Sequence, residues 1–305
     1  SRKDRESLEA VQLWLELEPE NVEANNTAAT LLARQYRPLE ALPHLAVVAR
    51  SGAQANFPIV LQGFNQLSAN DQSELVGEIN ALAVEFPQDP ALLLTQALVH
   101  TEFEQFRQAQ EKLDALFRVE PYQHQALLLE ARVRMASESS SPFAHIEEAL
   151  RVNPEDSLLR LEYARLLTTT DMSAARGQFE TLSAQNPQDT DLLLSLALVN
   201  REIGDDLAAK AYLRQVLVLK RRTDEAHYYL GRIAQDQNNS AEAVSHYRQV
   251  GDSRQYMSAN QRLGKILIES GQLAQSRAWF NAQRQAVPSR SEQLYNLEAD
   301  LLRSG

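Results

Sequence analysis

The chain has 305 residues, 30 Lys and Arg against 41 Asp and Glu, a formal net charge of −11 and no cysteine. Its 10 Gly and 11 Pro are too few for the many turns of a Rossmann domain, a TIM barrel or a β-sandwich, so the composition favours an almost wholly helical protein. The negative charge disfavours nucleic acid and anionic lipid as partners, and the lack of cysteine excludes disulfides, thiolate zinc sites and a cysteine nucleophile.

The first predicted element is an amphipathic helix within residues 1–19, whose apolar face carries Leu8, Val11, Trp14 and Leu15. The pattern is that of the second helix of a hairpin without its first helix, and an exposed apolar stripe of this kind often marks a contact surface. Self-association and a missing upstream helix are equal alternatives for what covers it. Because the chain opens with Ser inside a helical pattern, we expect an excised piece whose targeting segment has been cut away.

Proline recurs along the chain at a nearly constant spacing of about 34 residues or its multiples. It stands late in a helix-like pattern at Pro19, Pro87, Pro121, Pro154, Pro187 and Pro288. Proline suits the junction between two helices because it cannot continue the preceding one. The spacing predicts one continuous domain over 1–305, with partial units at 1–19 and 289–305 and full units at 20–53, 54–87, 88–121, 122–154, 155–187, 188–221, 222–254 and 255–288.

Two series of small residues keep the same phase as the prolines. The first is Ala29, Gly63, Ala97, Ala131, Ala164, Ala197, Gly231 and Gly264. The second is Ala41, Ala109, Ala175, Ala209 and Ala243, with Leu75 and Ser276 in its place in two units, and an apolar residue follows each four positions later. We interpret the first series as points where two helices cross closely, because a larger side chain would hold them apart. Each unit is therefore predicted to be a helical hairpin.

Two dipeptides give more local predictions. Asp89-Pro90 and Ser141-Pro142 each place a capping side chain before a proline, which is the usual start of a helix. The unit at 54–87 matches the repeat least well, because it lacks Ala at its second small position.

The repeat resembles the tetratricopeptide repeat, in which a Leu-Gly pair, a Tyr and an Ala-x-x-x-Phe/Tyr pattern occupy a helical hairpin. The best match is residues 227–231, His-Tyr-Tyr-Leu-Gly, followed by residues 243–247, Ala-Val-Ser-His-Tyr. The resemblance covers nearly the whole chain. It implies an all-α, right-handed solenoid of about eight hairpins with half units at both ends, whose first helices line a concave groove.

Residue patterns typical of catalysis or of a metal site are absent. No two of the six histidines lie three or four residues apart, so no helical metal-binding pair exists. Asp224-Glu225-Ala226-His227 spells a helicase-like tetrapeptide, but no Gly-rich phosphate loop accompanies it, and no Gly-x-Ser-x-Gly elbow occurs. We therefore predict that the chain is not an enzyme and carries no catalytic residue, metal or cofactor.

The predicted groove has two chemical halves. The residue after each small residue of the first series, and the residue four positions before that one, should face inward. These positions carry mostly apolar side chains in the first half of the chain and mostly basic ones in the second half. In the repeat where Leu198 interrupts the basic series, Arg201 lies one helical turn further on and could take its place. The predicted partner-binding residues are Phe64, Leu94, Leu98, Leu128, Arg132, Leu161, Arg165, Leu194, Arg201, Tyr228, Arg232 and Lys265.

Two interpretations of the basic stripe stay open. Its Arg side chains could pair with Glu on adjacent repeats, for example Glu162 or Glu202, and only stabilise the solenoid. Alternatively they bind an acidic or carboxylate-bearing peptide, since Arg binds carboxylates in bidentate fashion. The Lys and Asn clamp of chaperone-binding repeats is not reproduced. The large side chains of Trp14, Phe106, Phe179 and Trp279 are expected to lie in the core between repeats.

The chain as a whole is similar to bacterial periplasmic repeat lipoproteins, in particular to LbcA-type adaptors of carboxyl-terminal processing proteases. The similarity lies in Gln-rich junctions such as residues 86–90, Phe-Pro-Gln-Asp-Pro, and 186–190, Asn-Pro-Gln-Asp-Thr. It implies an outer-membrane-anchored protein that presents cell-wall hydrolases to a periplasmic serine protease. The lipidated Cys of such a protein is absent here. A cytoplasmic location, a scaffold for secretion or polysaccharide export and a repeat region of a larger enzyme remain alternatives.

Overall fold

A computed structural model of the chain describes residues 2–304, and it describes the side chains of residues 6–303. Every regular element in this range is a helix, which confirms the predicted all-α class. The chain divides into two compact units, Ser1–Glu155 and Asp156–Gly305. One continuous solenoid over 1–305 stays a prediction. None of the described helices is both long and apolar enough to span a membrane.

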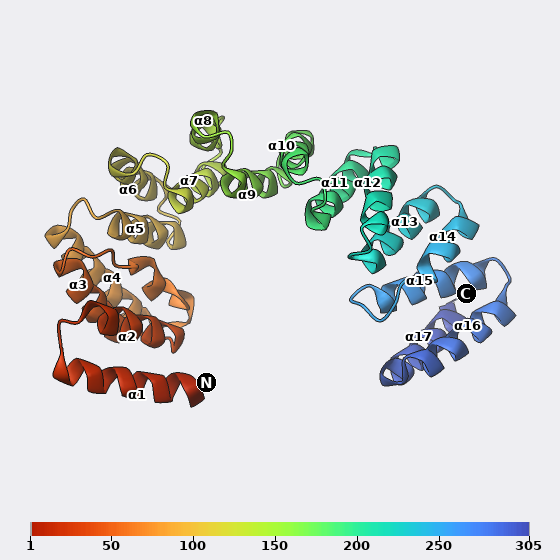
Figure 1. Ribbon diagram of the computed structural model, residues 1–305, viewed down its shortest axis with the longest axis horizontal. Helices are drawn as coiled ribbons and strands as arrows, with labels where there is room; N and C mark the ends of the chain where they lie inside the picture. Colours follow the sequence, from red (N-terminus) through yellow and green to blue (C-terminus); the bar gives the residue numbers. More distant parts are fainter. Residues whose placement is uncertain (1, 305) are drawn as a thin grey trace. The chain divides into compact units, whose positions relative to one another are not determined.

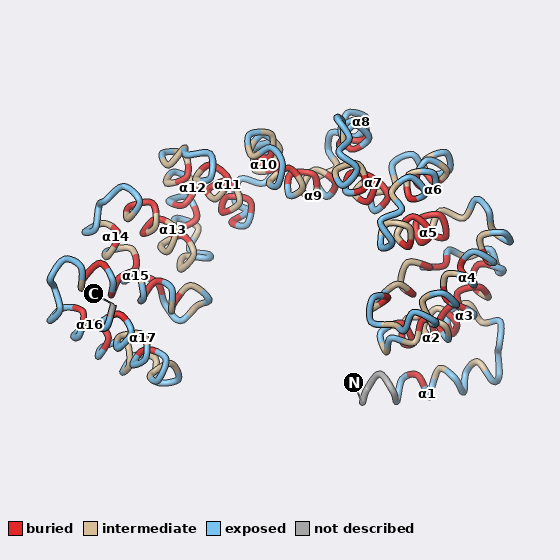
Figure 2. Tube along the Cα trace, turned by 180° about the vertical axis from the view of Figure 1, so that it is seen from behind, coloured by how far each residue is buried: buried red, intermediate tan, exposed pale blue. Residues whose placement is uncertain are grey.

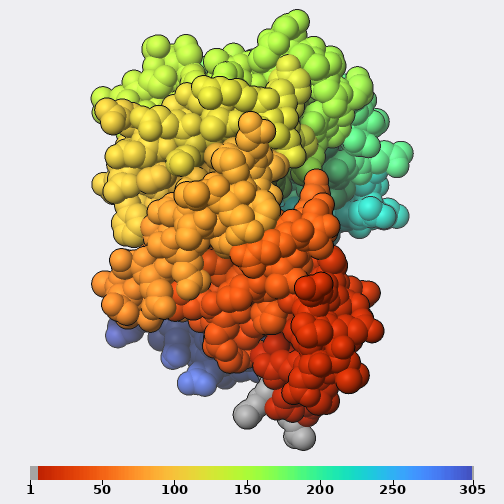
Figure 3. Space-filling model, turned by 90° about the vertical axis from the view of Figure 1, so that its left-hand side faces the viewer, coloured from red at the N-terminus to blue at the C-terminus, as the bar shows by residue number. Residues whose placement is uncertain are grey.

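The first unit is built from antiparallel helical hairpins that follow one another along the chain (Figure 1). Helix α1 packs on α2, and α2–α3, α5–α6 and α7–α8 form hairpins. Figure 3 shows the surface of these elements in chain order, from red to yellow. Their bounds are α1 (Arg2–Leu17), α2 (Val22–Arg34), α3 (Pro38–Arg50), η1 (Phe57–Leu61), η2 (Phe64–Gln66), α4 (Ala69–Glu85), α5 (Pro90–Glu102), α6 (Phe106–Val119), α7 (His124–Ala136) and α8 (Ala144–Val152).

The second unit repeats the same arrangement with greater regularity. Helices α9–α10, α11–α12, α13–α14 and α15–α16 pair in sequence order, and α17 packs against both α15 and α16. The bounds are α9 (Ser157–Leu167), α10 (Met172–Gln185), α11 (Thr190–Ile203), α12 (Asp206–Val218), α13 (Thr223–Asp236), α14 (Ser240–Tyr247), α15 (Tyr256–Glu269), α16 (Leu273–Ala286), η3 (Pro288–Arg290) and α17 (Ser291–Ser304).

Small residues lie where helices meet, as the spacing predicts. The five alanines of the first series are at most 2% exposed. A Cβ on Gly231 would lie 2.6 Å from the Tyr247 ring, and one on Gly264 would lie 2.7 Å from Leu301. In both units, buried residues gather on the sides of the helices that face their neighbours (Figure 2). The seven residues of the second series are also buried, namely Ala41, Leu75, Ala109, Ala175, Ala209, Ala243 and Ser276.

The repeat at residues 54–87 departs from a hairpin, because two 3₁₀ turns, η1 and η2, replace its first helix. Pro58 lies in the first turn of η1, and the left-handed Gly63, at φ 75°, separates η1 from η2. A Cβ on Gly63 would overlap the Tyr36 ring. The prediction of a helix crossing at Gly63 is therefore wrong. This glycine instead supplies a positive φ and a close approach of the backbone to an aromatic ring.

The helix starts confirm one local prediction and contradict the other. The Asp89 carboxylate accepts a hydrogen bond from the Leu92 N–H at 2.8 Å, so it caps α5 as expected. Ser141-Pro142 does not begin a helix. Helix α8 starts at Ala144, and its N-cap residue Phe143 makes no side-chain capping bond.

Three of the four large side chains expected in the core contribute to it. Phe179 is buried, and Phe106 and Trp279 pack at the edges of two core clusters. The Trp279 indole N–H also donates to Asn260 Oδ1 at 2.7 Å. Trp14 is 37% exposed, so its assignment to the core is wrong.

Candidate partner-binding site

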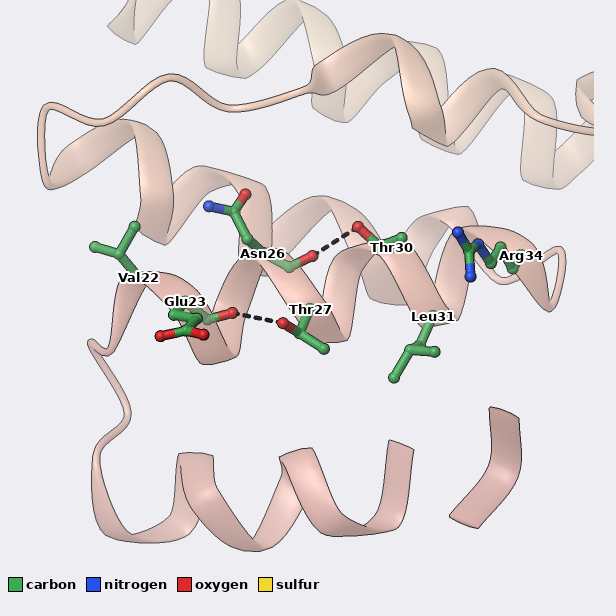
Figure 4. A pocket seen from close by; sticks show the side chains of 7 residues that line it. All are labelled: Val22, Glu23, Asn26, Thr27, Thr30, Leu31 and Arg34. Atoms are coloured by element: carbon green, nitrogen blue, oxygen red, sulfur yellow. Dashed lines mark hydrogen bonds between the residues drawn. The ribbon is translucent and has the colours of Figure 1, made fainter. Parts of the chain in front are cut away.

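The face of α2 is hollowed along one stripe of side chains (Figure 4). The hollow measures about 560 Å³ and includes Asn26 and Thr30, the two residues of this repeat predicted to face the groove. The hydroxyl of Thr30 donates to the Asn26 carbonyl at 2.8 Å, within its own helix. The other residues that line the hollow are Val22, Glu23, Thr27, Leu31 and Arg34.

The predicted apolar wall of the groove is only partly at the surface. Phe64, Leu94 and Leu194 are 2% to 4% exposed, so they belong mainly to the core. Leu94 and Phe64 also line hollows of the surface, and the role of all three as contact residues stays a prediction. Each packs between a helix and its neighbour, which the repeat phase alone does not reveal. Leu98, Leu128, Leu161 and Tyr228 are partly exposed, and these four keep the predicted position.

The predicted contact face of α1 is partly covered, and its role as a contact surface stays a prediction. Leu8 is buried, and Val11 and Leu15 are partly buried. Trp14 of the predicted face is exposed, and the apolar side chains of Leu13 and Leu17 are exposed as well. The helical pattern defines an apolar helix but does not say which half of a broad apolar face meets α2.

Three members of the basic stripe have ion-pair partners. The Arg165 and Lys265 side chains pair with Glu162 at 2.6 Å and Glu269 at 3.7 Å, one turn away on their own helices. Arg201 on α11 contacts Asp236 of α13 at 3.2 Å, a pairing between neighbouring hairpins. The interpretation that the stripe stabilises the solenoid therefore holds for Arg201. Exposed pairs within one helix contribute little, so Arg165 and Lys265 remain accessible to a partner.

Arg232 on α13 combines two features that other members of the stripe show singly. The Arg232 Nε atom is buried and has no hydrogen-bond acceptor, and its guanidinium forms no ion pair with any side chain among residues 6–303. Among the described residues, Arg201 also has a buried Nε without an acceptor, and Arg132 also has no ion pair. Arg232 lies near Tyr247, where burial raises the pKa of the phenol to about 12 and the Arg262 and Arg232 charges oppose that rise. An arginine in this state is a ready partner for a carboxylate. Arg132 is exposed on α7.

Arg262 on α15 is a further cation that the sequence pattern misses. Its Nη1 donates to Gln235 Oε1 at 3.2 Å, and Gln235 also accepts the Tyr247 hydroxyl at 2.8 Å. The repeat phase predicts that Gln261, the residue before Arg262, faces the groove. The signal that could have revealed Arg262 is its spacing of one helical turn from Lys265.

The fold brings together two histidines that lie far apart in sequence. His227 of α13 and His246 of α14 approach with their Nδ1 atoms 3.1 Å apart. Desolvation lowers the pKa of both imidazoles, and for His246 the neighbouring His227 lowers it further. The pair is therefore neutral at pH 7, with one ring donating to the other.

The hairpin geometry can be compared with known proteins. No family model matches the chain. The structure resembles the C-terminal part of a TPR repeat-containing protein from Cytophaga hutchinsonii, at a TM-score of 0.54 and 12% identity, over 80% of this chain and 94% of that one. This chain has the tetratricopeptide repeat fold. Yeast Tom70 is similar at a TM-score of 0.50 and 12% identity, over 88% of this chain and 60% of Tom70.

One curated relative extends the similarity to sequence. It is the TPR repeat-containing protein PA4667 of Pseudomonas aeruginosa, 29% identical over 303 residues and 98% of this chain. The chain spans about half the length of that relative. Tetratricopeptide repeats generally form noncatalytic scaffolds that bind other proteins.

Proposed function

We propose that this tetratricopeptide chain is a noncatalytic scaffold whose second unit holds a carboxylate-bearing segment of a partner protein. The observation that carries the proposal is Arg232, a cation on the first-helix series whose guanidinium forms no ion pair with any side chain among residues 6–303. A carboxylate of the partner would pair with this guanidinium through a charge-assisted hydrogen bond. The helices that present Arg232 are already ordered, so binding costs little conformational entropy.

Charge reversal of two basic residues of the second unit tests this proposal. The double variant Arg165→Glu and Arg232→Glu should weaken binding of a fluorescein-labelled Asp-rich peptide by about tenfold or more, because hydrogen bonds to charged groups are lost. Fluorescence anisotropy measures the affinity. Arg107→Glu is the matched control, since Arg107 is 86% exposed and lies on the second helix α6. Unchanged affinity together with a lower melting temperature would show that the stripe only stabilises the fold.

We also propose, from the resemblance to LbcA-type adaptors, that the partners are a periplasmic carboxyl-terminal processing protease and its cell-wall hydrolase substrates. The full protein would then be an outer-membrane lipoprotein. Co-purification from cells, with partners identified by mass, tests the partner. Recovery of membrane-assembly components instead would favour a secretion or polysaccharide-export scaffold. The natural N-terminus tests the location, because a signal peptide ending in a lipidated Cys is expected and a cytosolic start contradicts it.

A further inference from the structure

The broken repeat at residues 54–87 leaves one face of α5 open. Two hollows lie along this face, one of about 530 Å³ beside Ala91 and Leu94 and one of about 550 Å³ beside Leu98 and Glu102. Pro58 of η1 lines both hollows, so they are neighbours on this face, and the first also reaches the junction of α6 and α7. We treat the two hollows together as one groove. We call it the α5 groove. A regular hairpin would place a complete α-helix where η1 and η2 now lie.

The α5 groove has apolar side chains in both hollows. Leu98 is partly exposed, and it lines the second hollow together with the buried Phe64. Val119 is 44% exposed at the edge of the first hollow. Each hollow has a volume in the range of sites that bind small ligands or a few side chains.

All ionisable side chains that line the two hollows are carboxylates, namely Asp89, Glu102 and Glu120. Glu102 accepts a hydrogen bond from the neutral Asn65 amide at 2.9 Å, and Asp89 accepts one from the backbone of α5. No ion pair to any of the three occurs among the described residues. The groove therefore has a negative rim that a cationic partner would complement.

Side-chain amides supply the remaining polar surface. The lining amides with no side-chain hydrogen bond among the described residues are Gln54, Asn56, Gln62, Gln66 and Gln125. An amide side chain both donates and accepts, which suits the unpaired N–H and C=O groups of an extended peptide. A helical ligand already pairs these groups internally. The distance from Ala91 to Glu102 is about 16 Å along α5, the length of about five extended residues.

We propose that the α5 groove binds an extended segment of a partner protein in which apolar side chains alternate with Lys or Arg. The apolar side chains enter the two hollows, and the cations pair with Glu102 and Glu120. This goes beyond the function proposed above, because it concerns the first unit and the opposite charge preference. Its test is independent of the Arg232 variants.

The experiment uses three labelled seven-residue peptides and the whole chain. They alternate Val with Lys, Val with Glu, and Ser with Lys. The Val–Lys peptide should bind most tightly in fluorescence anisotropy. The double variant Glu102→Gln and Glu120→Gln should weaken it by about two- to thirtyfold, because each of the two ion pairs contributes about 0.2–1 kcal/mol. The matched control is Glu74→Gln with Glu78→Gln, two exposed carboxylates on α4.

Three outcomes would overturn the proposal. Equal binding of the Val–Lys and Ser–Lys peptides would show that the apolar hollows are not used. Equal weakening by the α4 control would show attraction to the net negative charge alone. No binding of the Val–Lys peptide at about 1 mM would show that the groove does not accept this class of segment. All four substituted carboxylates lie outside the buried core, so the variants should fold, and circular dichroism checks this.

Discussion

At the scale of single residues, the tightest packing of the second unit depends on two glycines. Gly231 faces the ring of Tyr247, and Gly264 faces Phe280 and Leu301. Both glycines lie inside helices, where glycine costs about 1 kcal/mol relative to alanine. Their presence shows that the close approach of the neighbouring side chains outweighs helix propensity.

Gly231→Ala should destabilise the fold by about 1–2 kcal/mol, because its Cβ would come within 2.7 Å of two Tyr247 ring atoms. Gly177→Ala is the matched control, since Gly177 also lies inside a helix but has no atom within 4 Å of its Cβ position. The Gly177→Ala variant should be more stable than the natural sequence by about 0.5–1 kcal/mol. Urea unfolding followed by circular dichroism measures both. A gain in stability for Gly231→Ala would show that the helices can move apart without cost.

The histidine pair makes stability depend on pH. Folding lowers the pKa of His227 and His246, chiefly through desolvation, so below a pH of about 6.5 the unfolded chain takes up more protons than the folded one. The contribution of the pair is complete above that pH and is lost as the pH falls through the lower pKa values of the folded state. The urea midpoint should therefore fall between pH 7.5 and pH 5.5.

The variant His227→Asn isolates this contribution, because it gives the hairpin the amide–imidazole pairing that Asn25 and His44 already form at 2.8 Å. It should show a smaller fall in urea midpoint than the natural sequence over the same pH range, since the coupling of two imidazoles is lost. An identical pH dependence in both proteins would assign the effect to other groups.

At the scale of elements, one buried carboxylate ties three helices together. Glu130 of α7 is 1% exposed. It accepts hydrogen bonds from Gln110 of α6 and Arg134 of α7, and it pairs with His145 of α8, all at 2.8 Å. A buried carboxylate is tolerated only when such partners satisfy it.

Glu130→Ala should destabilise the first unit by about 3 kcal/mol, because three polar groups lose their shared acceptor. Glu111→Ala should change stability little, since the Arg107–Glu111 pair is 86% and 63% exposed. Thermal unfolding by calorimetry compares the two variants. Equal melting temperatures would mean that Gln110, Arg134 and His145 find other partners.

At the scale of the whole molecule, the sequence predicts the repeat better than it predicts the surface. Repetition makes the small positions visible, because each recurs in nearly the same packing environment, as Ala97 and Ala197 do. The pattern does not predict the 3₁₀ turns at Phe57–Leu61 and Phe64–Gln66. Gly63 stands at the expected small position, but it adopts a left-handed turn conformation instead of lying in a helix. The pairing of His227 with His246 depends on how two helices face each other, which spacing along one helix does not report.

The candidate site was predicted less well for a related reason. Spacing identifies the helix face but not the depth of a side chain, so Leu94 and Leu194 were assigned to the surface although neighbouring helices bury them. Charge is the better guide to exposure for Arg132, Arg165 and Lys265, which lie at the surface because burying a charge without a partner is costly. Arg201 and Arg232 depart from this rule, since the Nε atom of each is buried without an acceptor.

The polar pairs across the hairpins have a consequence for how the repeat sequence varies. Asn25 pairs with His44, His227 with His246 and Asn260 with Trp279, each across the same 19 residues. The chemistry differs in each hairpin, being amide with imidazole, two imidazoles, and amide with indole. In each of these hairpins the same two repeat positions are joined by a side-chain hydrogen bond, although the groups that form it differ. One structural role in the repeat can therefore be filled by several side-chain pairs, provided that one group donates and the other accepts.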